Sequence, residues 1–118
     1  LAKTNGIQLI LSKIASLNTK KYPVIFMGDF NSKPKEERII SLKKDMLNTR
    51  EISQEKPFGP SGTFNGFKQN EPVTECIDYI FISKNSNFKV KKYAVLSDSK
   101  DLKYPSDHLP VYIELVIK

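Results

Sequence analysis

A run of bulky apolar residues that ends abruptly in polar ones places the strongest constraint on this chain. Residues 24–27 are all apolar, and Gly28, Asp29 and Asn31 follow closely. Such a run predicts a strand buried on both faces. Burying an unpaired carboxylate is costly, so Asp29 must reach water at the strand end, find a partner or face a metal. An Asx-turn, in which Asp29 only shapes the strand exit, explains the same residues equally well.

Helices are expected on both sides of this strand in the sequence. Apolar residues recur at steps of three and four over about residues 3–18, which predicts an amphipathic helix, and Pro23 prevents its continuation. A second helix is expected over about 35–46, where Pro34 is tolerated in a first helical turn. This order favours a layered fold in which helices cover a sheet.

The last third of the chain predicts β structure. Residues 73–83 and 88–96 are rich in β-branched and aromatic side chains, and the turn cluster at 84–87 suggests that they pair as a hairpin. Residues 109–117 alternate between apolar and less apolar positions, as a strand does. The polar passage up to about residue 72 contains several Gly and Pro residues, so most of it is expected to be irregular.

Composition narrows the class of protein without fixing its function. The chain has 118 residues, enough for one core, and 39% hydrophobic with 27% charged residues is ordinary for a globular domain. The sequence contains no run of about 18 apolar residues, so it predicts no membrane span. The net charge of +6 weakly favours a polyanionic partner such as nucleic acid or phosphorylated lipid. A single cysteine, Cys76, excludes an intrachain disulfide and is expected to pack in the core.

Polar residues interrupt three otherwise apolar strands. They are Asp29 with Asn31, then Asp78, then Asp107 with His108. If neighbouring strands bring them together, the cluster offers a metal-binding carboxylate, a base and an acid that orients the base. Hard divalent cations prefer carboxylate oxygens, and a histidine exchanges protons near pH 7, so the set suits phosphoester hydrolysis. A lone histidine at a strand entrance is also common as a structural residue.

Residues 62–67 combine aromatic and hydrogen-bonding side chains within the irregular passage. One interpretation is a rim that faces a ligand, with Thr63 and Asn65 binding substrate. The other is a loop whose aromatic residues anchor it to the core.

Three short motifs occur in order along the chain: Gly28-Asp29-Phe30-Asn31, Ile77-Asp78-Tyr79-Ile80 and Ser106-Asp107-His108-Leu109-Pro110-Val111. In this order and at about these separations, they resemble the C-terminal half of the endonuclease/exonuclease/phosphatase superfamily. This group includes pancreatic-type deoxyribonucleases, abasic-site endonucleases, neutral sphingomyelinases and inositol polyphosphate 5-phosphatases. The segment 62–67 is similar to a loop in bacterial members. The resemblance covers essentially the whole chain from the first helix onward.

This resemblance implies a fold and a set of residue roles. Residues 1–118 would be a single incomplete domain of α/β (α+β) class, the C-terminal half of a two-sheet β-sandwich flanked by helices. Asp29 would orient or deprotonate the attacking water or contact a metal, and Asn31 would bind the scissile phosphate. Asp107 would be a metal ligand, and His108 would be the catalytic histidine paired with Asp78. The expected cofactor is Mg²⁺ or Mn²⁺.

Two functional hypotheses follow. The first is a metal-dependent phosphoesterase, with a nuclease slightly favoured by the basic charge and a phosphatase or sphingomyelinase-like enzyme as the alternative. The family's upstream Asn, metal-binding Glu and second His cannot be placed in this sequence, so this fragment alone is expected to be inactive. The second hypothesis is therefore a catalytically silent fragment or interaction module. Half a sandwich exposes an apolar face, which would pair with the missing N-terminal half or with another copy.

Overall fold

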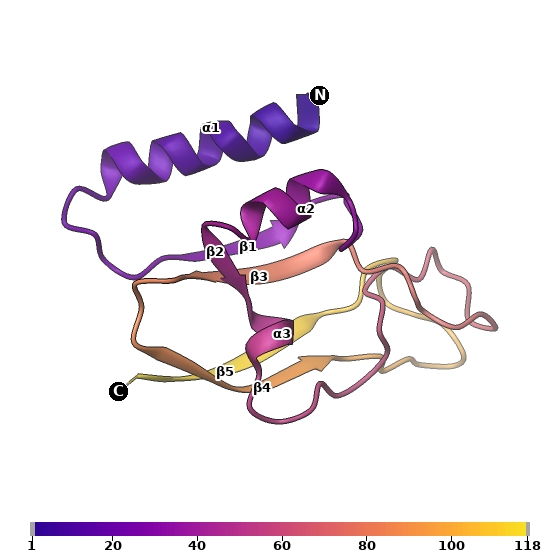
Figure 1. The fold of residues 1–118 in the computed structure, drawn as a ribbon. Helices are drawn as coiled ribbons and strands as arrows, with labels where there is room; N and C mark the ends of the chain where they lie inside the picture. The colour runs from indigo at the N-terminus through magenta and orange to yellow at the C-terminus, as the bar shows by residue number, and fades with distance from the viewer. Residues whose placement is uncertain (1, 118) are drawn as a thin grey trace.

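Two helices, a three-stranded sheet and a two-stranded sheet form successive layers in the computed structural model, which describes residues 2–117 (Figure 1). The first sheet has three antiparallel strands in the order β1 (Ile25–Asp29), β3 (Asp78–Ser83) and β2 (Met46–Asn48). The second sheet pairs β4 (Phe88–Val95) with β5 (Val111–Ile117). The three helices are α1 (Ala2–Leu17), α2 (Glu37–Leu42) and the single turn α3 (Thr49–Ile52). This mixed α/β arrangement with two antiparallel sheets confirms the expected fold class.

Alternation along β3 divides its side chains between two faces of the first sheet. Tyr79 and Phe81 belong to one core with Ile39 and Leu42 of α2. Ile80 and Ile82 point to the opposite face because side chains alternate along a strand, and β4 and β5 lie on that side (Figure 1). All four β3 residues are buried, so this central strand has a continuous apolar sequence.

The second core lies over the β4–β5 sheet. It contains Val73, Tyr93, Val95 and Leu109, with Ile113 packed against them. Cys76 is also buried, but in the core beneath the helices, as expected for a packing residue, and burial raises the pKa of its thiol. None of the helices in the described residues 2–117 has the length and apolar character needed to cross a membrane.

The predicted hairpin of residues 73–83 and 88–96 is wrong. β3 pairs with β1 and β2, whereas β4 pairs with β5, so the turn after Ser83 carries the chain from one sheet to the other. A turn cluster marks a reversal of the chain without specifying the partner of the next strand. The strand expected from residue 73 starts only at Asp78, and the helix expected to reach residue 46 ends at Leu42, before the unpredicted β2.

The prediction that β1 is buried on both faces is also wrong. Ile25 and Met27 are 43% and 64% exposed, whereas Phe26, on the other face, packs against the helix-side core. In residues 2–117, β1 pairs on one side only, with β3, and is an edge strand of the sheet. Met27 lies directly opposite the buried Ile80. It therefore continues the apolar surface on the inner face of the sheet, the face on the side of β4 and β5, beyond the part that is covered.

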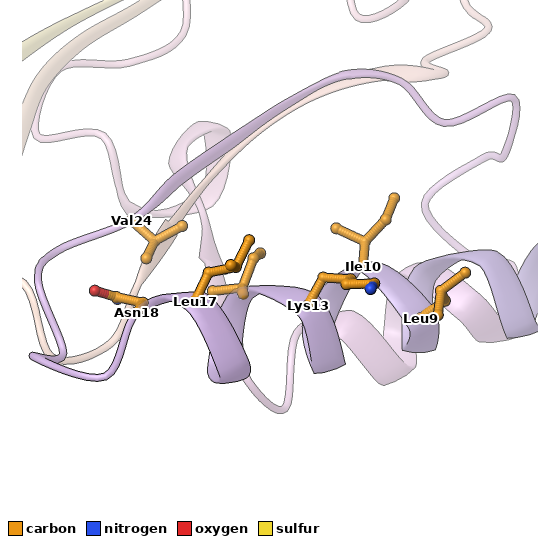
Figure 2. A pocket seen from close by; sticks show the side chains of 7 residues that line it. Leu9, Ile10, Lys13, Leu17, Asn18 and Val24 are labelled. Atoms are coloured by element: carbon orange, nitrogen blue, oxygen red, sulfur yellow. The ribbon is translucent and has the colours of Figure 1, made fainter.

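An apolar hollow lies between α1 and the chain leading into β1 (Figure 2). Its volume is about 470 Å³, and its lining includes Leu9, Ile10, Lys13, Leu17, Asn18 and Val24. Leu17 is 81% exposed at this place. Exposed apolar surface therefore occurs on α1 as well as on the inner face of β1.

We predict that the 118-residue chain self-associates and that Met27→Lys weakens the association. An edge strand with exposed apolar side chains pairs readily with other chains, and an inward-pointing lysine opposes this. Sedimentation velocity over a concentration series measures the effect. Phe58→Lys is the matched control, because Phe58 is 72% exposed but lies along β4. A wild-type chain that stays monomeric throughout the series would contradict the prediction.

Candidate active site

The ends of β1 and β3 bring two acidic residues together. Asp29 is the last residue of β1 and Asp78 the first of β3, and the antiparallel register places them directly opposite each other. Opposed residues in such a pair project from the same face of the sheet. His108 lies just before β5, and Phe64 forms bridges with both Glu75 and His108. Loops accordingly gather at the end of the sandwich where β1 ends and β3 and β5 begin (Figure 1).

His108 lies between the two carboxylates. Its Nδ1 is 2.9 Å from Asp78 Oδ2 and 3.2 Å from Asp78 Oδ1, and its Nε2 is 3.7 Å from Asp29 Oδ2. An ionised carboxylate only accepts hydrogen bonds, so Nδ1 is the donor and Nε2 faces Asp29. Within residues 2–117, ligand atoms of Asp29, Asp78 and His108 lie within 4.8 Å of one another, a group that could hold a metal ion.

The surroundings of His108 favour its protonated form. The hydrogen bond to Asp78 is the main cause that raises the pKa of His108, and the negative charges of Asp78, Asp29 and Asp107 add to it. Partial burial acts in the opposite direction. The rings of Phe64 and His108 meet in a T-shaped arrangement, with centroids 5.3 Å apart. His108 is therefore held in one orientation with an elevated affinity for a proton.

Thr63 is fully buried, and its hydroxyl forms hydrogen bonds that hold the site in place. Thr63 Oγ1 donates to Asp78 Oδ2 at 2.7 Å and accepts from the backbone N–H groups of Ile77 and Asp78 at 3.1 Å. Gly62 allows the loop to lie this close to the backbone of residues 74 and 75, because a Cβ at position 62 would lie 2.5 Å from the Glu75 backbone nitrogen. Thr63 thus positions Asp78 from inside the protein, and its expected contact with substrate stays a prediction.

Asn65 is likewise buried and connects the loop to the segment before β5. Its backbone N–H donates to the Asp107 carbonyl at 2.8 Å, and its Nδ2 donates to the Ser106 carbonyl at 2.9 Å. Its Oδ1 accepts from the Phe67 backbone N–H at 2.6 Å. These bonds make Asn65 a support for the loop, and its expected contact with substrate stays a prediction.

Asp29 both forms a turn and contributes to the site. Its Oδ1 accepts from the Asn31 backbone N–H at 2.7 Å, which is the Asx-turn considered above, while Oδ2 faces His108. Asn31 has a φ of 48°, so extended geometry ends at Asp29 and does not align the two side chains. Both residues are exposed and accessible to a ligand.

Two supports of this turn have no motif that marks them in the sequence. The guanidinium of Arg38, on α2, is buried and donates to the Phe30 carbonyl and to Ser32 Oγ. Tyr79 donates its hydroxyl to the Ser32 carbonyl at 2.7 Å. Their polar atoms therefore fix the chain that follows Asp29. Only the contacts in the folded chain identify them, since a helical arginine and a strand tyrosine are unremarkable in the sequence.

Asp107 is the predicted metal ligand that lies outside the group of three. It is half-buried, its backbone carbonyl accepts from Asn65, and its charge acts on His108. Its role as a metal ligand stays a prediction. In the described part of the chain, no glutamate joins the group.

A family model described as the endonuclease/exonuclease/phosphatase family matches residues 3–108. The chain belongs to this family. A solved structure of a functionally unknown conserved protein from Enterococcus faecalis V583 is 32% identical, with a TM-score of 0.88 over 99% of this chain and 45% of that one. The mannosyl-6-phosphatase of Bacteroides thetaiotaomicron is also 32% identical, with a TM-score of 0.85 over 98% of this chain and 46% of that one.

More distant structures share the fold. The human Nocturnin catalytic domain is 23% identical and matches with a TM-score of 0.68 over 92% of this chain and 38% of that one. A comparison with curated proteins gave no match. The chain thus spans less than half the length of the solved family structures that it matches.

We predict that Thr63→Val lowers the free energy of unfolding by about 1–3 kcal/mol, because a carboxylate and two backbone N–H groups lose their partner. Thr63→Ser keeps the hydroxyl and is the matched control. Urea unfolding followed by circular dichroism measures both variants. If valine were as well tolerated as serine, the hydroxyl would not be the group that holds the site.

We also predict that Asp78→Asn lowers the pKa of His108. The folded-state pKa lies above the ordinary value of 6.5, so protonated His108 stabilises the fold below pH 6.5, and this stabilisation is lost as the pH rises through the folded-state pKa. The chain has one histidine, so NMR titration of its ring protons in EDTA gives the value directly. An unchanged pKa in Asp78→Asn would exclude the carboxylate as its cause.

Proposed function

We propose that this chain supplies the histidine-bearing part of a metal-dependent phosphoester hydrolase. The convergence of Asp29, Asp78 and His108 at one end of the sandwich carries the proposal. Membership of a family whose usual activity is phosphoester hydrolysis supports the same class of reaction.

The carboxylates suit a hard divalent cation. Mg²⁺ and Mn²⁺ are bound by one or two carboxylates, and substrate phosphate and water complete the coordination. Asp29 offers the exposed Oδ2 and Asp107 a half-exposed side chain, whereas Asp78 is engaged by His108 and Thr63. Asp29 and Asp107 are therefore the residues that would hold the ion, which supplies positive charge to the phosphate oxygens.

The remaining groups serve the proton and the phosphate. Hydrolysis forms a bond from a water oxygen to phosphorus, breaks the ester bond and transfers a proton from the water to the leaving alcohol. Asp29 orients the water or takes its proton, and Asn31 binds the phosphate. His108 acts on the substrate through Nε2, because its Nδ1 is hydrogen-bonded to Asp78. Asp78 and Thr63 fix the imidazole so that Nε2 keeps its direction.

Phosphorylated sugars are the first substrate class to test. The mannosyl-6-phosphatase is 32% identical over nearly the whole of this chain, whereas Nocturnin, at 23%, shares the fold alone. The net charge of +6 favours nucleic acid as the second class, because basic residues neutralise phosphates along a polyanion. Phosphorylated sugars rank first because 32% identity to a sugar phosphatase is stronger evidence than a positive charge that comes from lysines scattered along the sequence.

Activity assays of the full-length gene product test the proposal. Mannose 6-phosphate, plasmid DNA, abasic oligonucleotide and sphingomyelin are offered with Mg²⁺, Mn²⁺ or EDTA. We expect hydrolysis that EDTA abolishes, and His108→Ala should lower kcat by roughly 10²–10⁴-fold, the typical contribution of a positioned acid or base. We expect Asp29→Ala to be impaired as well.

Asp101→Ala provides the control, because Asp101 is an exposed acid in the loop that precedes His108 and does not belong to the group. Undiminished activity in both Asp29→Ala and His108→Ala would rule out the assigned site. The 118-residue chain assayed by itself should hydrolyse little, since its group of ligands includes one histidine and no glutamate in residues 2–117.

A further inference from the structure

Phe67 is an exposed aromatic residue in a backbone conformation that aromatic residues rarely adopt. Its φ is +62° and that of Gly66 is +58°, and the Lys68 N–H donates to the Asn65 carbonyl at 3.0 Å. These features define a two-residue turn with both central residues left-handed, whose second central position usually holds glycine. The side chain of Phe67 is nevertheless 63% exposed. Core packing therefore does not account for a phenylalanine here.

The turn that carries Phe67 is attached by hydrogen bonds to residues 106–108, the segment that contains His108. Asn65 accepts the Phe67 N–H on Oδ1 and donates to the carbonyls of Ser106 and Asp107. Two residues earlier in the loop than Gly66, Phe64 forms a bridge and a ring contact with His108. The backbone at Phe67 is consequently held in a fixed position relative to His108. Strained backbone that the surroundings maintain is concentrated at functional sites.

Two other exposed apolar residues show that neither exposure nor a left-handed turn is enough by itself to connect a residue to the segment 106–108. Phe58 is 72% exposed, but it runs beside β4 with a backbone bridge to Ala94 and no positive φ. Leu102 is 79% exposed with a φ of +61°, in a turn closed by hydrogen bonds between Lys100 and Lys103. In the described residues, neither makes the connection to residues 106–108 that Asn65 gives to Phe67.

We propose that Phe67 is a specificity-determining residue that stacks on the ring of the substrate's organic group, a proposal that rests on the phosphoesterase function above. The electron-rich face of an aromatic ring attracts the C–H face of a pyranose, and an aromatic ring also stacks on a nucleobase in an offset arrangement. Phosphate at His108 would place the esterified group at the loop that carries Phe67. The substrate class is therefore a phosphate ester of a ring-containing alcohol.

Steady-state kinetics of the full-length gene product test this contact. The substrates are mannose 6-phosphate, adenosine 5′-monophosphate and the acyclic glycerol 3-phosphate. We expect Phe67→Ala to raise KM about tenfold for at least one ring ester, with kcat and the glycerol 3-phosphate values within twofold of wild type. Which ring ester responds distinguishes the sugar from the nucleobase. Phe58→Ala and Leu102→Ala are matched controls, and we expect both to leave all three substrates unaffected.

A binding measurement separates this proposal from the hydrolytic function. These 118 residues contain no tryptophan, so Phe67→Trp introduces the first one in them, and its emission is measured as the difference between the variant and the otherwise identical protein. In a His108→Ala background, we expect mannose 6-phosphate or adenosine 5′-monophosphate to change the added emission saturably, and inorganic phosphate to change it little. Binding without hydrolysis by the wild type would retain the role of Phe67 and reject the phosphoesterase.

Two results would overturn the role of Phe67. One is an equal loss of activity on glycerol 3-phosphate and both ring esters in Phe67→Ala, which would indicate a general disturbance of the loop. The other is added tryptophan emission that responds to neither ring phosphate, whether or not the wild-type protein hydrolyses them.

Discussion

The antiparallel register between β1 and β3 is the constraint on which the candidate site depends. It sets Asp29 opposite Asp78 at one end of the pair, so that both side chains project from the same face of the sheet. Because side chains alternate along a strand, a slip of one residue would turn Asp29 toward the helices and place Gly28 opposite Asp78. Phe26, which pairs with Phe81 and packs against the helix-side core, opposes such a slip because it would leave that core. Packing in the core thus determines the chemistry at the strand ends.

Support for the site comes from residues that do not themselves face the solvent. Asp78 receives hydrogen bonds from His108 and Thr63, and Thr63 in turn receives two from the backbone. A partly buried carboxylate such as Asp78 needs partners of this kind, because its desolvation is otherwise costly. The interactions that stabilise the chain here and those that orient the imidazole are the same ones. Stability and geometry of the site are accordingly difficult to change separately.

The sequence allows α1, most of the longer strands and the three polar positions to be predicted, because these follow from local patterns, whereas the short β2 and α3 were not expected. The apolar stripe before Pro23 gave α1 within a residue at each end, and polar residues in apolar strands identified Asp29, Asp78 and His108. Partners of strands are not local, so the β3–β4 hairpin was wrong and the open edge of β1 was missed. A motif also does not reveal the direction of a side chain. The hydrogen bonds of Thr63 and Asn65 to other protein groups, for example, could not be predicted from the motif that contains them.

The Asx-turn at the end of β1 gives one carboxylate two different partners. Asp29 Oδ1 holds the backbone of Asn31, while Oδ2 is directed at His108. Any proton or cation that occupies Oδ2 withdraws negative charge from Oδ1 and weakens its bond to Asn31. By reciprocity, a change in the left-handed conformation of Asn31 alters the affinity at Oδ2. Ion occupancy and the placement of the residue assigned to the phosphate are therefore thermodynamically coupled across a single side chain.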